Sequence, residues 1–224
     1  MTSVVRAALG DAFEELHPKV QWRFGLESGD GRSQVGVGVM EEMTHSPLVP
    51  PPVLWLGSRR GLFPGGKGTE VPFTIVNYAY TDDLGRETMS FVRRFQFLGK
   101  AQGMNSVMVT PSTPSKPGVA LDYLGFHSDM IVETTCRVED GGLILDSGPP
   151  RLLGIRIPQF ASARTTGREW WDESEHRHRI QIDVTSPLLG RLFHYRGWFT
   201  AEERSCTAAE VPASARPSRL EHRE

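Results

Sequence analysis

Two charged residues lie on the apolar face of a predicted strand, and their presence there is the strongest chemical signal in the chain. Alternate positions in residues 86–97 place on one face Glu87, Met89, Phe91, Arg93, Phe95 and Phe97. Glu87 and Arg93 lie about 20 Å apart along the strand, too far to pair directly. A lone buried charge costs several kcal/mol, so each needs another partner or a wet cavity. We therefore predict an apolar pocket with a few polar groups, with Glu87 as catalytic acid or base and Arg93 binding a substrate carbonyl or carboxylate. In the alternative reading, both side chains lie near strand ends and reach solvent.

Three tyrosines are the other candidate site residues. Asp122 and Tyr123 are neighbours on a strand and face opposite ways, so only one of them can join a pocket. We expect Asp122 to bond to the following turn and Tyr123 to be catalytic. Tyr195 lies on the more apolar side of the last strand, where aromatic core packing is the alternative. We predict that Tyr78, Arg93 and Tyr195 bind the substrate.

The histidines and glycines do not form a cofactor motif. His176 and His178 could bind zinc with a neighbouring acid, but no third ligand at a fixed geometry is predicted. The acidic run at 172–175 is more typical of a solvated hairpin tip. Gly36 and Gly38 lack the third glycine of a dinucleotide fingerprint, and no P-loop, CxxC or HExxH motif occurs. We predict no metal and no cofactor, and the pattern assigns no role to His127.

Composition limits the class of protein. The 224 residues suffice for one large domain or two small ones, and 38% hydrophobic with 23% charged residues is typical of a globular protein. A net charge of −2 gives no reason to expect binding to nucleic acid or to a membrane. No signal peptide is recognised, and no apolar run reaches the roughly 18 residues of a membrane span. Only two cysteines occur, which fits a reducing compartment, so we expect a cytoplasmic protein.

The predicted elements are a helical segment followed mostly by strands. Ser3 can cap a first helix, which Pro18 interrupts. Residues 35–43 could form a strand or a short helix, and 53–63 resemble a short helix. The later chain alternates with a period of two, which gives candidate strands at 71–80, 86–97, 106–109, 119–126, 129–138, 143–146, 152–157, 162–171, 178–185 and 192–200. Short turns indicate an antiparallel meander, and a meander this long usually closes to avoid exposed edges.

Several blocks resemble a bacterial family catalogued as DUF4166, a domain of unknown function. They include residues 68–80, 141–143 with 147–148, Gly85-Arg86-Glu87-Thr88, Asp122-Tyr123-Leu124-Gly125 with His127, Glu169-Trp170-Trp171-Asp172, and the ending 188–197. The similarity covers roughly residues 7–202, and the family name implies no reaction. The chain departs from the family at 47–52 and 110–117, which are richer in Pro and Ser. We expect these two segments to shape a specialised pocket mouth.

Together these observations predict a mainly β, calycin-like antiparallel barrel over residues 1–202. The N-terminal helical segment would cover one end, and residues 203–224 would form a disordered tail. The function we expect is a cofactor-independent enzyme of polyketide-type natural-product biosynthesis. It would be a cyclase or isomerase, such as a Diels–Alder-type cyclase, acting on a hydrophobic small molecule. The alternative is a non-catalytic carrier or sensor of a lipid-like ligand, and a homodimer is a possible assembly.

Overall fold

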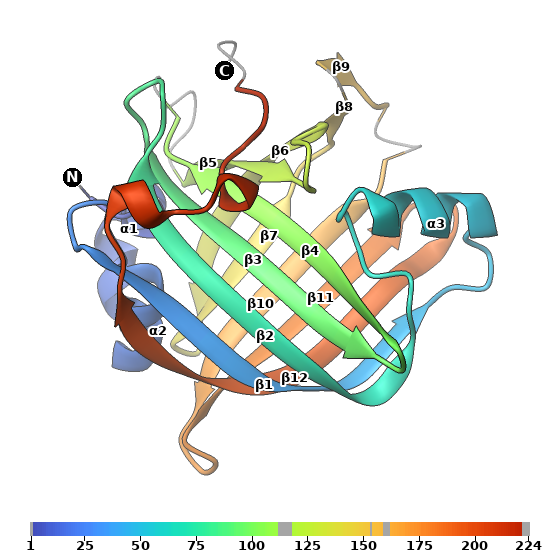
Figure 1. The fold of residues 1–224 in the computed structure, drawn as a ribbon, viewed down its shortest axis with the longest axis horizontal. Helices are drawn as coiled ribbons and strands as arrows, with labels where there is room; N and C mark the ends of the chain where they lie inside the picture. The colour runs from blue at the N-terminus through green and yellow to red at the C-terminus, as the bar shows by residue number, and fades with distance from the viewer. Residues whose placement is uncertain (1, 112–117, 153, 159–161, 221–224) are drawn as a thin grey trace.

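Ten antiparallel strands form a closed barrel in the computed structural model, which describes residues 2–111, 118–152, 154–158 and 162–220. The order is β5-β4-β3-β2-β1-β12-β11-β10-β7-β6, and a β5–β6 pairing closes the ring. This confirms the predicted mainly β barrel (Figure 1). The barrel strands are β1 Arg32–His45, β2 Gly68–Thr81, β3 Glu87–Phe97, β4 Lys100–Val109, β5 Val119–Leu124, β6 Met130–Glu139, β7 Gly142–Ser147, β10 Arg164–Asp172, β11 Arg177–Ser186 and β12 Gly190–Ser205. Two short strands, β8 Arg151–Leu152 and β9 Ile155–Arg156, extend the sheet beyond β6.

The N-terminal helices close one end of the barrel. They are α1 Val4–Leu9, the 3-10 helix η1 Gly10–Glu15 and α2 Pro18–Phe24. Ser3 caps α1 by accepting from the Arg6 backbone N–H, and Pro18 occupies the first turn of α2. Their apolar side chains, among them Phe13 and Phe24, belong to the main hydrophobic core inside the barrel. Burial of that face is what holds these short helices in place, because helices of this length are marginal alone.

The segment left open at 35–43 is part of strand β1, and its glycines allow close packing against β12. A Cβ at Gly38 would lie 1.9 Å from the Trp198 carbonyl oxygen, and one at Gly197 would lie 2.2 Å from the Val39 carbonyl oxygen. Both distances are too short for any other residue. The alternating glycines therefore serve the approach of two strands and not a nucleotide-binding loop.

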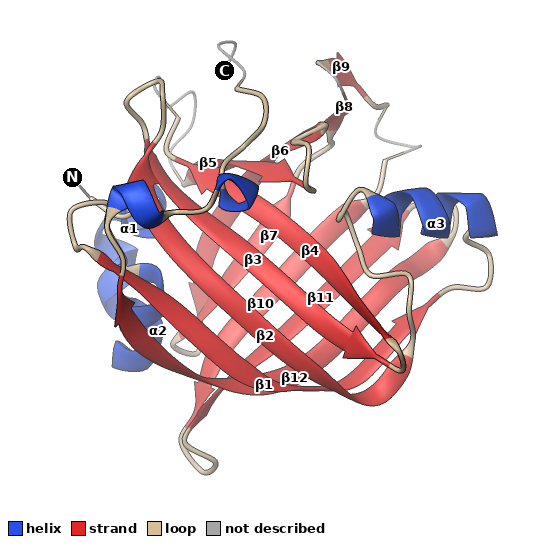
Figure 2. Ribbon diagram, in the orientation of Figure 1, coloured by secondary structure: helices blue, strands red, loops and turns tan. Residues whose placement is uncertain are grey.

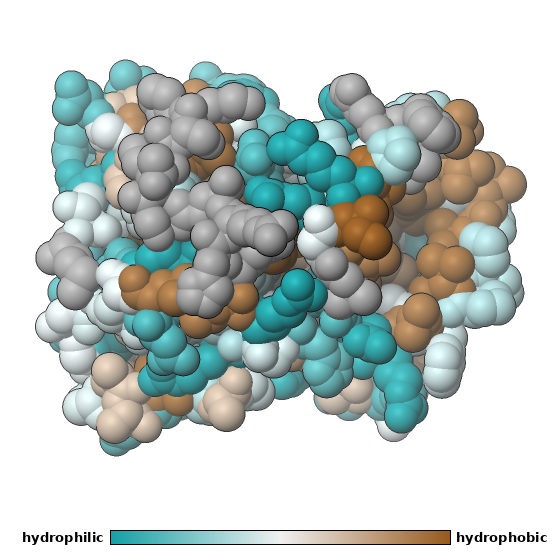
Figure 3. Space-filling view, turned by 90° about the horizontal axis from the view of Figure 1, so that it is seen from above, coloured by the Kyte–Doolittle hydropathy of each residue, from teal (hydrophilic) through white to brown (hydrophobic). Residues whose placement is uncertain are grey.

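The opposite end of the barrel carries α3 Pro51–Arg59, a shorter helix than the one expected at 53–63. It ends where Gly61 adopts a positive φ of 68°, which a helix cannot continue through. Figures 1 and 2 show α3 across the barrel end away from α1 and α2. Seen from above, hydrophobic side chains gather on the side where α3 lies (Figure 3). No helix in the described part of the chain is long and apolar enough to cross a membrane.

The C-terminal segment packs on the outside of the barrel, which differs from the disordered tail expected at 203–224. Strand β12 runs on to Ser205, and two 3-10 turns follow, η2 Ala208–Glu210 and η3 Ala213–Ala215. Val211 and Ala215 are buried against an outer apolar cluster, and the Tyr80 hydroxyl donates to the Ala215 carbonyl at 3.0 Å. Two small apolar residues spaced over such a polar segment suffice to anchor it, and composition alone misses them. Residues 221–224 lie outside the described residues.

Candidate functional site

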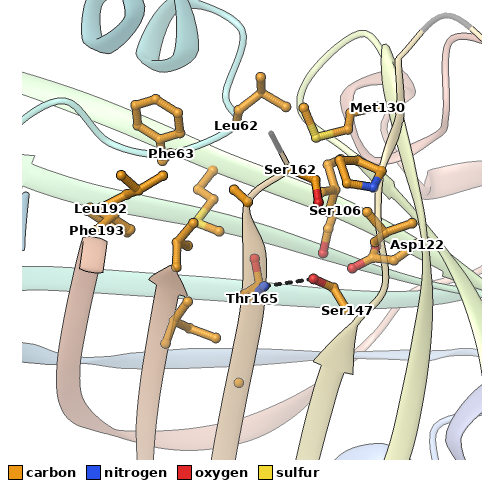
Figure 4. A pocket seen from close by; sticks show the side chains of 18 of the residues that line it. Leu62, Phe63, Ser106, Asp122, Met130, Ser147, Ser162, Thr165, Leu192 and Phe193 are labelled. Carbon is orange, nitrogen blue, oxygen red and sulfur yellow. Dashed lines mark hydrogen bonds between the residues drawn. The ribbon is translucent and has the colours of Figure 1, made fainter. Parts of the chain in front are cut away.

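A cavity of about 330 Å³ opens in the α3 end of the barrel. One wall is apolar and comes from the α3 region and strands β11 and β12, with Val53, Leu54, Leu62, Phe63, Ile182, Val184, Leu192 and Phe193. The facing wall comes from strands β3, β4, β5, β6, β7 and β10 and carries the polar residues Arg93, Asn105, Ser106, Asp122, Thr134, Ser147 and Thr165. Figure 4 shows Leu62, Phe63, Leu192 and Phe193 on one side, and Ser106, Asp122 and Ser147 on the other. Such a cavity suits a largely apolar molecule with a polar group at one side.

Asp122 is the titratable acid on the polar wall. Its Oδ1 atom is inaccessible and has no hydrogen-bond partner among the described residues, while the remaining exposed surface of the residue faces the cavity. Burial raises the pKa of Asp122 from its ordinary 3.8 to about 7, against the opposing effects of the Arg93 charge and a hydrogen bond with Ser106. A carboxyl group with this pKa exchanges its proton near neutral pH, as a general acid or base must.

Arg93 supplies positive charge to the same wall. Its Nη1 donates a long bond, 3.4 Å, to the Ser106 hydroxyl, and its guanidinium lies 5.2 Å from the Phe91 ring centroid. Its Nε has no partner, and no ion pair to Arg93 is formed within the described residues. The residue is only 9% exposed, so its unused donors are held out of bulk water. A buried guanidinium with free donors is suited to bind a carbonyl, enolate or carboxylate oxygen of a ligand.

Strand register explains why Asp122 and Arg93 meet. In β5, Asp122 lies opposite Met108 of β4 and Val132 of β6, and both of these side chains point into the barrel. Arg93 lies on the inward face of β3, as its alternation with apolar residues predicts. Ser106 of β4 lies near both: its hydroxyl accepts from Arg93 Nη1, and it lowers the pKa of Asp122 against the effect of burial.

Of the five predicted site residues, Arg93 alone lines the cavity as far as the described residues show. Glu87 faces inward near the helix-covered end, where it accepts bonds from the Ser28 backbone N–H at 2.6 Å and the Ser28 hydroxyl at 2.7 Å. Tyr195 is fully buried between Phe95 and Phe193, the core-packing alternative.

Tyr123 and Tyr78 lie on the outer side of the barrel. Tyr123 belongs to the outer apolar cluster and receives a bond from Arg86 Nη2 at 3.3 Å, and Tyr78 is half-buried against the same cluster. Asp122, expected to bond a turn, takes the pocket position instead. The sequence showed that one of the two neighbours would face inward, but both faces of β5 are apolar, so alternation could not decide between them.

A second buried charged group lies at the helix-covered end. Arg23 Nε donates to Glu169 Oε1 at 3.0 Å, and Arg23 Nη1 donates to the Gln34 side chain at 3.1 Å. His178, expected at a solvated turn, is buried and stacks on Phe199 with ring centroids 5.1 Å apart. Burial lowers the pKa of His178 to about 3. No group of three or more potential metal ligands comes together in the described parts of the chain.

The two unusual segments expected at a pocket mouth can be placed only in part. Val49 of the 47–52 segment lines the cavity, next to α3. Residues 112–117 of the other segment lie outside the described residues. Ser106 and Thr134 were not predicted as site residues, because small polar residues in strands carry no signal beyond their inward register. Asn105 was not predicted either, and its side chain bonds to Ser214 and Arg94 on the outer side of the barrel.

Comparison with known proteins identifies the family. The Domain of unknown function (DUF4166) matches residues 16–199. The uncharacterized protein YndH of Bacillus subtilis (strain 168) is 30% identical over 194 residues, which cover 84% of this chain and 92% of YndH. No solved structure matches the chain. The chain therefore belongs to the DUF4166 family.

Proposed function

We propose that the protein binds a largely apolar small molecule in the barrel cavity and converts it by proton transfer at Asp122, as a cofactor-independent cyclase or isomerase. The observation that carries this proposal is the Asp122 carboxyl group on the polar wall of the cavity, where one of its oxygens has no hydrogen-bond partner among the described residues. The proposal moves the acid–base role from Glu87 and Tyr123 to Asp122, because Glu87 is bonded to Ser28 and Tyr123 lies outside the barrel.

The chemistry follows from two charged groups and the shape of the cavity. The Asp122 carboxylate removes a proton from the carbon next to a ligand carbonyl, and the carbon–hydrogen electron pair moves into the enolate. Arg93 donates to the enolate oxygen and stabilises its negative charge. The protonated Asp122 returns the proton at another carbon, which gives an isomer with no net loss of atoms. The apolar wall holds a flexible chain in one pose, and this positioning would also favour ring closure, including a Diels–Alder-type closure of a polyketide-like chain.

A C–H exchange assay tests this function without a known substrate. The probe is an apolar β-keto ester in D₂O, and NMR follows replacement of its acidic hydrogens by deuterium. We expect the wild-type protein to accelerate exchange at neutral pH and Asp122→Asn to abolish the acceleration. Glu87→Gln is the matched control, since it neutralises a buried carboxyl outside the cavity lining and should leave exchange intact. Equal acceleration by wild type and Asp122→Asn would refute the acid–base role.

The second candidate is a non-catalytic carrier of a hydrophobic ligand, favoured by the apolar wall of the cavity. Binding of cis-parinaric acid, a fluorescent fatty acid, would occur in either case. The carrier is supported if native mass spectrometry finds an unchanged lipid bound to the purified protein and no exchange activity is present. We also propose a cytoplasmic location and a homodimer, and the exchange and binding assays depend on neither.

A further inference from the structure

The barrel end that carries the cavity exposes large apolar side chains on α3, on the link before it and on the β11–β12 turn. We call these residues the apolar rim: Leu48, Val53, Trp55, Leu56, Leu188 and Leu189, each between 43% and 71% exposed. The β11–β12 turn lies beside the link before α3, because Ser46 N–H bonds to the Leu192 carbonyl at 2.8 Å. In the space-filling view, hydrophobic side chains crowd the side of the molecule where α3 lies (Figure 3). Single exposed apolar residues are ordinary, but six at one end mark a contact surface.

The rim is continuous with the cavity. Val53 is half exposed and also lines the cavity, together with Val49 and Leu54 from the same segment. Leu192, three residues after Leu189, lines the cavity from the other side. An apolar molecule could therefore pass between the rim and the cavity without crossing a polar barrier at α3.

The charge around the rim is positive, against the net negative charge of the chain. Residues 46–69 contain no Asp or Glu but contain Arg59, Arg60 and Lys67. Arg60 pairs with Asp129, and Arg191 after the β11–β12 turn pairs with Asp183, so Arg59 and Lys67 are the rim charges that no described ion pair neutralises. The Arg59 guanidinium lies 5.6 Å from the Trp55 ring centroid. An exposed tryptophan with neighbouring leucines and arginines is the combination by which short helices lie in the interface of an anionic bilayer.

We propose that the apolar rim docks on an anionic lipid bilayer and that the ligand of the cavity enters from that bilayer. The docking deepens the proposed function, since it names the bilayer as the source of the apolar ligand. The net charge of −2 gave no reason to expect a membrane contact, and the local distribution of charge supplies one. Arg59 and Lys67 would contact lipid phosphates while Trp55 and Leu56 enter the acyl boundary.

Vesicle flotation tests the docking with no ligand present. The full chain is mixed with vesicles of phosphatidylcholine alone and with vesicles of equal parts phosphatidylcholine and phosphatidylglycerol. We expect binding to the anionic vesicles that weakens as salt is raised. The triple variant Trp55→Ser, Leu56→Ser, Leu188→Ser should lose at least about tenfold in partitioning, because burying each apolar side chain contributes to binding. Val37→Ser, which changes a 56% exposed side chain on the barrel wall, should bind as the wild type does.

The outcomes separate docking from the proposed function. Absence of binding to the anionic vesicles, or equal binding of the triple variant and Val37→Ser, would overturn the proposal. A wild-type dimer in solution that the triple variant loses, with no vesicle binding, would show that a second copy covers the rim and would also overturn it. Binding of cis-parinaric acid by the triple variant, measured in buffer, confirms that the cavity is intact. A failure of docking with that binding retained leaves the proposed function standing on its own test.

Discussion

The raised pKa of Asp122 predicts how Asp122→Asn should change stability with pH. The carboxyl holds its proton up to about pH 7 in the folded protein and only to about 3.8 in the unfolded chain. Below pH 4 both states are protonated, so the group has no effect. Between pH 4 and 7 the unfolded chain releases the proton first, so the free energy of unfolding falls as pH rises. Above pH 7 the full cost of a buried carboxylate is present.

The magnitude follows from the size of the shift. About three pKa units at about 1.4 kcal/mol each give about 4 kcal/mol of stability lost between pH 4 and 7. This is an upper limit, because part of Asp122 faces the cavity. Asp122→Asn removes the titration, so the variant should gain stability relative to wild type by up to this amount as pH rises from 4.5 to 8. If the amide shifts the free energy of unfolding by the same amount at every pH, such a constant shift does not alter the predicted change between pH 4.5 and 8.

Urea denaturation followed by tryptophan fluorescence at a series of pH values measures the effect. Asp140→Asn is the control, since Asp140 is exposed in the β6–β7 turn and has a positive φ of 50° that Asn also tolerates. The control should follow the wild-type pH dependence. Parallel stability curves for wild type and Asp122→Asn from pH 4.5 to 8 would show that Asp122 has an ordinary pKa and would remove its claim to acid–base chemistry.

Three further predictions follow from the buried groups. Arg93→Met should change the free energy of unfolding by no more than about 1 kcal/mol, since no described carboxylate pairs with Arg93. Binding of cis-parinaric acid to this variant should fall. A large loss of stability would show that Arg93 has a structural role instead. Arg23→Met should destabilise the protein by about 3–5 kcal/mol in urea, because it leaves Glu169 buried and unpaired, and an unchanged midpoint would contradict the buried pair. Burial raises the pKa of the Cys136 thiol to about 12. A thiol reagent at pH 8 should therefore label Cys206 alone in the folded protein and both cysteines in urea. Fast labelling of Cys136 in the folded protein would refute its burial.

The barrel could be predicted from the sequence because its signals are local. Two-residue alternation from residue 70 onward and short turns define the meander, and closure follows from the cost of open edges. Arg93 was placed correctly for the same reason, since Phe91 and Phe95 flank it on the inward face. Glu87 was also placed inward, but its Ser28 partner lies 59 positions earlier in the chain, and no local pattern reveals such a contact.

The error at Asp122 and the error at the tail have one physical cause. The C-terminal segment covers an apolar cluster on the outer side of β4 and β5, with Val211 and Ala215 against Val107 and Tyr123. Because that cover exists, β5 is apolar on its outer face as well as its inner one. Alternation then gives no direction, and Tyr123 resembles a pocket residue as well as Asp122 does.

The covering segment is polar in composition, so the sequence did not predict that it packs on the barrel, and the outer cluster beneath it could not be inferred.

The covering segment also contacts the cavity wall. Asn105 lines the cavity, and its side-chain amide donates to the Ser214 carbonyl in the covering segment at 3.1 Å. Its side-chain oxygen also accepts from Arg94 Nη1 at 3.1 Å. The segment after β12 therefore bonds to a residue of the cavity wall, although it lies on the outside of the barrel. The cover that lets the outer face of β5 be apolar comes from Val211 and Ala215, more than 80 positions after Tyr123, which is why the fold was accessible to pattern reasoning and the acid of the site was not.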